Sequence, residues 1–189
     1  VILIKDSKDF QVLSNFGDSS FGINDVDERI IEYLAKEKTR RQNNGSLSSR
    51  NKEITNNYYN LVKELKKHIT EYGQAAVDLN EMTVYPVKFN KKPNQDEIIL
   101  NKKDICDKLC KDIYDWSLAH IDKSVHQADV KEKNIDEIIL IGGPDKMPGF
   151  YELLKQLHPN KNITFVGEDD LSVGAAIVVK FWPYIKISS

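Results

Sequence analysis

The sequence has little cysteine, tryptophan or methionine, with two residues of each type. Cys106 and Cys110 lie four apart on an expected helix, a geometry that suits a mutual disulfide badly, and the further ligands of a zinc site are missing nearby. We therefore expect both thiols to pack as small apolar side chains on a helix face. Neither a disulfide framework nor a metal site is expected.

The sequence also lacks an excess of either charge and any long hydrophobic run. Lys and Arg number 27 and Asp and Glu 29, so the net charge is −2 and no overall field favours nucleic acid. The longest apolar runs, such as residues 138–141 and 175–179, are far shorter than the roughly 20 residues of a membrane-spanning helix. We expect no nucleic-acid partner, no membrane segment and a cytoplasmic location, with the endoplasmic reticulum as the alternative.

An initial methionine and a signal-peptide pattern are absent as well. The chain begins with Val1-Ile2-Leu3-Ile4, an apolar segment typical of a strand, so we expect it to be part of a longer protein. A hydrophobic content of 40% over 189 residues is enough for a real core in one domain or in a compact pair of subdomains.

Apolar periodicity predicts an α/β protein in which helices pack on a sheet. Helices are expected around Val26, Ile30 and Leu34, and at about 55–70, 104–121, 148–157 and 171–181. Strands are expected at 1–4, 10–13, 74–82, 83–89, 97–100, 136–141 and 162–166. Within residues 74–82, the alternation of Ala76, Asp78 and Asn80 with Ala75, Val77 and Leu79 predicts a half-exposed strand.

The middle of the chain differs from its ends, because long helices dominate it. We therefore expect a base subdomain from about residues 1–26 and 129–189, and an inserted helical and β cap from about 27–128. In this arrangement residues 1–13 share a sheet with 138–141. His120 repeats with the apolar positions of its helix, which predicts a partly packed residue rather than a metal ligand.

The segment Ile139-Leu140-Ile141-Gly142-Gly143 carries the first functional pattern. A strand that ends in two glycines and leads into a helix brings backbone amides close to a ligand at the carboxyl edge of the strand. Nucleosides and phosphates are bound in this way. Taken alone, however, the pattern also fits a tight turn without any ligand.

Three segments in the same order make the ligand-binding interpretation more specific. IDEIILIGGPDKMPGFYELLKQL resembles the adenosine-binding strand, turn and helix of the seventy-kilodalton heat-shock (DnaK-type) chaperones, whose turn reads Gly-Gly-Ser-x-Arg-x-Pro. GDSSFGINDVDERI resembles the Gly-Asp-Thr-x-Leu-Gly-Gly-x-x-Phe-Asp signature of that family, and EDDLSVGAAIVV resembles its Asp-x-Ala-Val-Ala-x-Gly-Ala-Ala helix. The matching positions include Gly17, Asp18, Gly22, Asp27, Gly142, Gly143 and Pro148. The resemblance covers nearly the whole chain.

The resemblance implies the second, adenosine-contacting lobe of an actin-like ATPase domain, in a divergent member of the family. Residues 63–70, KELKKHIT, resemble the Glu-x-x-Lys-Arg-x-x-Ser of its adenosine-contacting helix. On this basis Lys66 would reach the ribose, Lys67 would lie against the adenine face and Thr70 would hydrogen-bond the adenine edge. The adenosine-contacting residues so implied are Gly142, Gly143, Lys146, Lys66, Lys67, Thr70 and Glu168.

The resemblance also implies cofactors and partners. The cofactor would be ATP or ADP, with magnesium held mainly by the first lobe, which carries most of the phosphate-handling and catalytic groups. The partners would be that lobe and the polypeptide-binding domain of the same protein, a nucleotide-exchange factor, a J-domain co-chaperone and unfolded polypeptides. No catalytic residue is expected in this chain, so we do not expect it to be a complete enzyme by itself.

Several positions depart from the family pattern. Lys63 replaces an acidic residue that accepts a hydrogen bond from the ribose, and Lys67 and Lys146 replace arginines that sandwich the adenine ring. An ammonium cannot stack as a planar guanidinium does, and Pro144 in place of a serine offers neither a hydroxyl nor a backbone donor. We expect these replacements to weaken nucleotide binding about a hundredfold.

Three interpretations of function stay open. The first is an ATP-binding chaperone whose nucleotide cycle controls polypeptide binding. The second, favoured by the lysine replacements, is a non-enzymatic relative that acts as a co-chaperone, exchange factor or scaffold with a degraded nucleotide pocket. The third is another actin-like ATPase or a sugar kinase of the same lobe architecture. Without the resemblance, residues 63–70 would be an ordinary solvated helix face.

Overall fold

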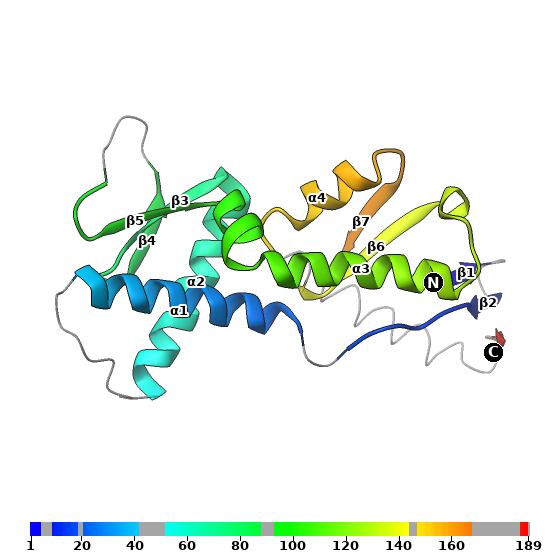
Figure 1. The fold of residues 1–189 in the computed structure, drawn as a ribbon, viewed down its shortest axis with the longest axis horizontal. Coiled ribbons are helices and arrows are strands. Elements are labelled where there is room, and N and C mark those ends of the chain that lie inside the picture. The colour runs from blue at the N-terminus through cyan, green and yellow to red at the C-terminus, as the bar shows by residue number, and fades with distance from the viewer. Residues whose placement is uncertain are drawn as a thin grey trace. The chain divides into compact units, whose positions relative to one another are not determined.

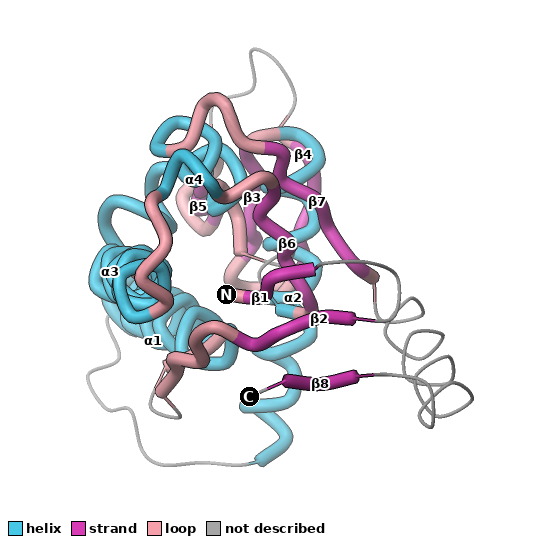
Figure 2. The backbone as a smooth tube through the Cα atoms, turned by 90° about the vertical axis from the view of Figure 1, so that its right-hand side faces the viewer, coloured by secondary structure: helices cyan, strands magenta, loops and turns pink. Residues whose placement is uncertain are grey.

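The computed structural model describes residues 1–4, 9–18, 21–41, 52–87, 93–143, 147–167 and 186–188. The chain forms two compact units, and each is described by itself. Unit 1 comprises Val1–Ser20, Asp115–Asp145 and Tyr151–Ser189, and unit 2 comprises Phe21–Tyr114 and Lys146–Phe150. Helices together with antiparallel and parallel strand pairs confirm the expected α/β class (Figures 1 and 2). The base and cap boundaries expected at about residues 26 and 128 stay a prediction.

Unit 2 begins with two long helices, α1 (Ile23–Arg41) and α2 (Lys52–Tyr72). The expected apolar stripes are confirmed: Val26, Ile30 and Leu34 of α1 are fully buried. On α2 the buried stripe is Leu61, Val62, Leu65 and Ile69. The backbone amide of Gly22 donates to the Asp25 carboxylate (2.6 Å), which satisfies a free donor at the start of α1. The helices therefore meet through the faces that the sequence pattern predicts.

A three-stranded antiparallel sheet follows α2, with the strand order β4-β3-β5. The strands are β3 (Gln74–Asp78), β4 (Thr83–Pro86) and β5 (Glu97–Asn101). The expectation of a half-exposed strand at 74–82 was wrong, because Ala75, Ala76 and Val77 are all buried. Ala76, which is 2% exposed, pairs with Tyr85 on one side and Ile99 on the other, so it lies in the central strand between two larger residues.

The helix expected at 104–121 is not one regular α-helix. Residues Asp104–Leu109 form a π-helix in which the Cys110 amide donates to the Ile105 carbonyl at 2.9 Å, and α3 follows at Lys111–Gln127. The wider turn places Ile105, Cys110 and Ile113 on one buried face, a spacing that a search at three and four residues misses. Asn101 and Asp104 exchange side-chain and backbone hydrogen bonds, which fixes the start of this helical segment.

The described residues of unit 1 form two small sheets. One has the order β1-β2-β8, from β1 (Ile2–Ile4), β2 (Asp9–Val12) and β8 (Lys186–Ser188). The other pairs β6 (Glu137–Ile141) with β7 (Asn162–Val166) in parallel, and α4 (Phe150–Leu157) connects them. The expected pairing of residues 1–13 with 138–141 was wrong for the described residues, which place them in separate sheets. The apolar pattern of a segment predicts a strand, but it does not predict which other strand will pair with it.

Two expectations concern other parts of the chain. The helix expected at 171–181 lies outside the described residues. In the described part, none of the helices combines the length and the hydropathy that crossing a membrane requires.

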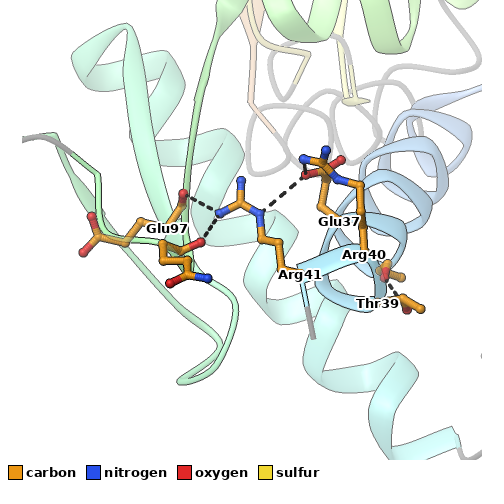
Figure 3. A network of polar contacts seen from close by, with 7 residues as sticks. Glu37, Thr39, Arg40, Arg41 and Glu97 are labelled. Carbon is orange, nitrogen blue, oxygen red and sulfur yellow. Dashed lines mark hydrogen bonds and ion pairs between the residues drawn. The ribbon is translucent and has the colours of Figure 1, made fainter. Parts of the chain in front are cut away.

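A polar network fastens the end of α1 to the start of β5 (Figure 3). The Arg41 guanidinium donates through Nη1 to the Gln95 carbonyl (2.6 Å) and the Glu97 carbonyl (3.0 Å). Its Nε lies 3.5 Å from the Glu37 carboxylate, which also pairs with Arg40. The Glu97 side chain itself is buried and accepts hydrogen bonds from the backbone and side chain of Asn94. These contacts hold residues 94–97 against the end of α1.

A short segment from late in the chain, residues 147–150, completes unit 2. The Pro148 carbonyl accepts hydrogen bonds from the Tyr114 hydroxyl (2.9 Å) and the Cys106 thiol (2.8 Å). The Phe150 ring meets the Tyr114 ring edge-on at 5.8 Å. Gly149 has φ +84°, and a Cβ there would lie 2.6 Å from the Cys106 sulfur. The segment therefore approaches the helix so closely that only glycine fits.

We predict that Gly149→Ala destabilises the protein by about 2–4 kcal/mol, because it combines positive-φ strain with a steric clash. Gly73→Ala is the matched control, since Gly73 has φ +81° but nothing within 4 Å of a Cβ. Gly73→Ala should lower the free energy of unfolding only by the backbone strain, about 1–2 kcal/mol. Urea unfolding of the two variants measures the difference. Equal losses would show that the contact with Cys106 is not tight.

Candidate functional site

The helix α2 presents the expected adenosine-contacting residues on different faces. Lys67 and Thr70 are exposed, whereas Lys66 is only 6% exposed. Lys66 follows Val62 by four residues and precedes Ile69 by three, so it lies at the edge of the buried stripe. The side chains of Lys67 and Thr70 are accessible to a ligand in solution, and that of Lys66 is largely enclosed.

Lys66 is engaged in a buried ion pair with Asp27 of α1. Its Nζ lies 2.5 Å from Asp27 Oδ1, and the two side chains are 7% and 17% exposed. Oδ1 is buried and has no hydrogen-bond partner among the described residues, so the nearby ammonium compensates its charge. Two opposite charges removed from water in this way attract each other more strongly than a surface pair does. The pair ties the second turn of α1 to α2.

The glycine pair after β6 also has a defined backbone. Gly142 has φ +76°, a conformation that other residues rarely adopt, and no atom lies within 4 Å of the place where a Cβ would be. The chain therefore turns sharply at the carboxyl end of β6, as the Gly-Gly pattern predicts. Lys146 and Glu168, the remaining expected contacts, lie outside the described residues.

The expected site residues belong to both units. Lys66, Lys67 and Thr70 are in unit 2, and Gly142 and Gly143 are in unit 1. Their convergence on one adenosine stays a prediction. Asp27 is the residue whose role the sequence reasoning missed. The sequence does contain a pattern that indicates a partly buried position for Asp27. It lies four residues after Ile23 and three before Ile30, next to the buried stripe of α1.

The cysteines and His120 pack as expected. Cys106 and Cys110 are free thiols, and burial raises the pKa of Cys110 to about 12, so it stays a neutral thiol near neutral pH. The His120 ring lies 3.8 Å from the Trp116 ring and 4.8 Å from the Phe16 ring, between centroids. Across the described residues, His, Cys, Asp and Glu side chains form no group of three or more that could hold a metal ion.

We predict that Lys66→Met lowers the free energy of unfolding by about 3 kcal/mol, because it leaves the Asp27 carboxylate buried without a counter-charge. Lys67→Met, at the exposed neighbouring position, is the control and should change stability by less than about 0.5 kcal/mol. The double variant Asp27→Leu with Lys66→Met should regain most of the loss, since it removes both charges. Denaturant titration tests all three. A Lys66→Met variant as stable as Lys67→Met would contradict the buried pair.

Comparison with known proteins gives a consistent result. The chain matches the family described as "Hsp70 protein" over residues 1–182. It is 27% identical over 169 residues to the chloroplastic stromal 70 kDa heat shock-related protein of Pisum sativum, covering 89% of this chain and 23% of that protein. It is 26% identical to the chaperone protein dnaK of Emiliania huxleyi, again over 89% of this chain and over 26% of that protein.

A cyanobacterial relative extends the same similarity. The chaperone protein dnaK3 of Synechococcus elongatus is 25% identical over 171 residues, which cover 89% of this chain and 22% of that protein. This chain thus spans about a quarter of the length of the curated relatives it matches. Because the family match extends over nearly the whole sequence, the chain belongs to the Hsp70 family.

Proposed function

We propose that this chain is the adenosine-contacting second lobe of the ATP-binding domain of an Hsp70-type chaperone. The observation that carries the proposal is the family match over residues 1–182, together with exposed Lys67 and Thr70 on α2 and the positive φ of Gly142 after β6. Lys67 and Thr70 would contact the adenine, and the Gly142-Gly143 turn would offer backbone amides. Lys146 and Glu168 complete the proposed set.

The described residues fit a nucleotide in part. An exposed ammonium and an exposed hydroxyl on one helix are suitable donors for a nucleoside. Lys66, in contrast, could reach a ribose only while sharing its charge with Asp27, 2.5 Å away. ATP or ADP would supply the phosphates, and we propose that magnesium is held mainly by groups outside this chain.

The whole protein, on this proposal, couples its nucleotide state to the binding and folding of polypeptides. Its partners would be the first lobe, a polypeptide-binding domain, a nucleotide-exchange factor and a J-domain co-chaperone. The cytoplasm is the proposed location. Some of the relatives that match this chain are chloroplastic proteins.

We predict that adenosine and ATP bind the chain with a dissociation constant in the millimolar range or weaker, about −4 kcal/mol, because lysines replace the stacking arginines. Backbone amide NMR during titration to about 10 mM nucleotide should shift Thr70, Gly142 and Gly143. Thr70→Ala should remove the shifts at the helix, and guanosine is the ligand control. Micromolar binding centred on other residues would overturn the proposed site.

The same titration separates the proposal from its alternative. A non-enzymatic co-chaperone or scaffold is favoured by the engagement of Lys66 with Asp27 and by the lysine at position 67. In that case the spectrum stays unchanged up to about 10 mM adenosine or ATP while the protein is folded.

We also predict no ATPase activity above background for this chain by itself. Phosphoryl transfer depends on a positioned metal ion, nucleophile and phosphate-binding groups, and these are proposed to belong to the first lobe. Phosphate release is the measurement, with a Lys67→Ala variant as the control. Release that fell on this substitution would show a catalytic site within the chain.

A further inference from the structure

A polar pocket lies in unit 1, at the opposite end of β6 and β7 from the Gly142-Gly143 turn. It has a volume of about 470 Å³ and is lined by Glu132, Lys133, His158, Pro159, Asn160 and Lys161. Residues 132–134 precede β6, and residues 158–161 connect α4 to β7 (Figure 1 labels these elements). Five residues of strand, about 16 Å, separate this end of β6 from its carboxyl end. The pocket is therefore distinct from the proposed adenosine contacts.

Two side-chain contacts join the loops that form the pocket. His158 Nδ1 lies 2.8 Å from the Glu132 carboxylate, and Lys161 Nζ donates to the Ile135 carbonyl at 2.5 Å. The backbone adds a bond from the Lys161 amide to the His158 carbonyl at 3.1 Å. The walls are thus held by interactions on both sides, and the pocket does not depend on one flexible side chain.

The lining keeps unused donors and a positive balance of charge. Lys133 and Asn160 have no hydrogen-bond or ion-pair partner among the described residues, and Lys161 uses one of its three N–H donors on Ile135. Lys133 and Lys161 outweigh the single carboxylate of Glu132, whatever the protonation of His158. Every lining residue except Pro159 carries a polar or charged side chain.

We propose that this pocket binds a small phosphate-bearing anion between Lys133 and Lys161, with the Asn160 amide as a further donor. Lysine is a compact point charge that suits phosphate, and hydrogen bonds between charged partners are stronger than neutral ones. The His158 ring is held by Glu132 through Nδ1, which fixes one wall of the pocket. The proposal is independent of nucleotide binding after β6.

Titration of the whole chain with inorganic phosphate, followed by backbone amide NMR, tests the proposal. Saturable shifts are expected at Lys133, Asn160 and Lys161, and sodium chloride at matched ionic strength should not reproduce them. Shifts that are absent, or that chloride reproduces, would overturn the proposal. Lys133→Gln should weaken phosphate binding about fivefold or more, because it removes a charge-assisted hydrogen bond.

Two further variants make the test specific. Lys131→Gln removes an exposed charge that precedes the same turn but does not line the pocket, so phosphate binding should change less than about twofold. Glu132→Gln removes the single negative charge of the lining and should tighten binding, an outcome that general loosening of the loop cannot produce. Equal effects of Lys131→Gln and Lys133→Gln, or weaker binding in Glu132→Gln, would count against the pocket.

Discussion

The close contact between Gly149 and Cys106 fixes the point at which the chain re-enters unit 2. No side chain fits between the residue 149 backbone and the Cys106 sulfur, so the backbone itself forms the interface. This proximity brings the Pro148 carbonyl to both the Cys106 thiol and the Tyr114 hydroxyl. The same segment lies between the glycine turn after β6 and the helix α4. The contact thus fixes residues 147–150 within unit 2.

Most of the elements could be predicted from the sequence, because burial in this protein follows helix and strand periods closely. The exceptions are instructive. The π-turn at Cys110 adds one residue to the helical period, so the buried sequence Ile105, Cys110 and Ile113 does not follow a spacing of three and four residues. Strand pairing was also missed, since the apolar pattern of β1 and β6 is the same whichever neighbour each strand takes.

The candidate site stays a prediction, because a resemblance fixes residue positions without fixing their surroundings. Lys66 and Lys67 are adjacent in the sequence and chemically identical, but one is buried against Asp27 and the other is exposed. The helical period separates them, since only position 66 lies beside Val62 and Ile69 on the stripe. The pocket near Lys133 was not visible from the sequence, since its lining comes from two loops with no recognisable motif.

The way in which the chain is divided between the two units sets an order for folding during synthesis. Unit 2 is nearly complete once residue 114 has been made, and its helices and antiparallel strands are joined mainly by contacts between neighbouring segments. Unit 1 has to wait, because β6 cannot pair until β7, more than twenty residues later, has left the ribosome. Until then the edge of β6 that β7 later covers has no partner strand among the described residues.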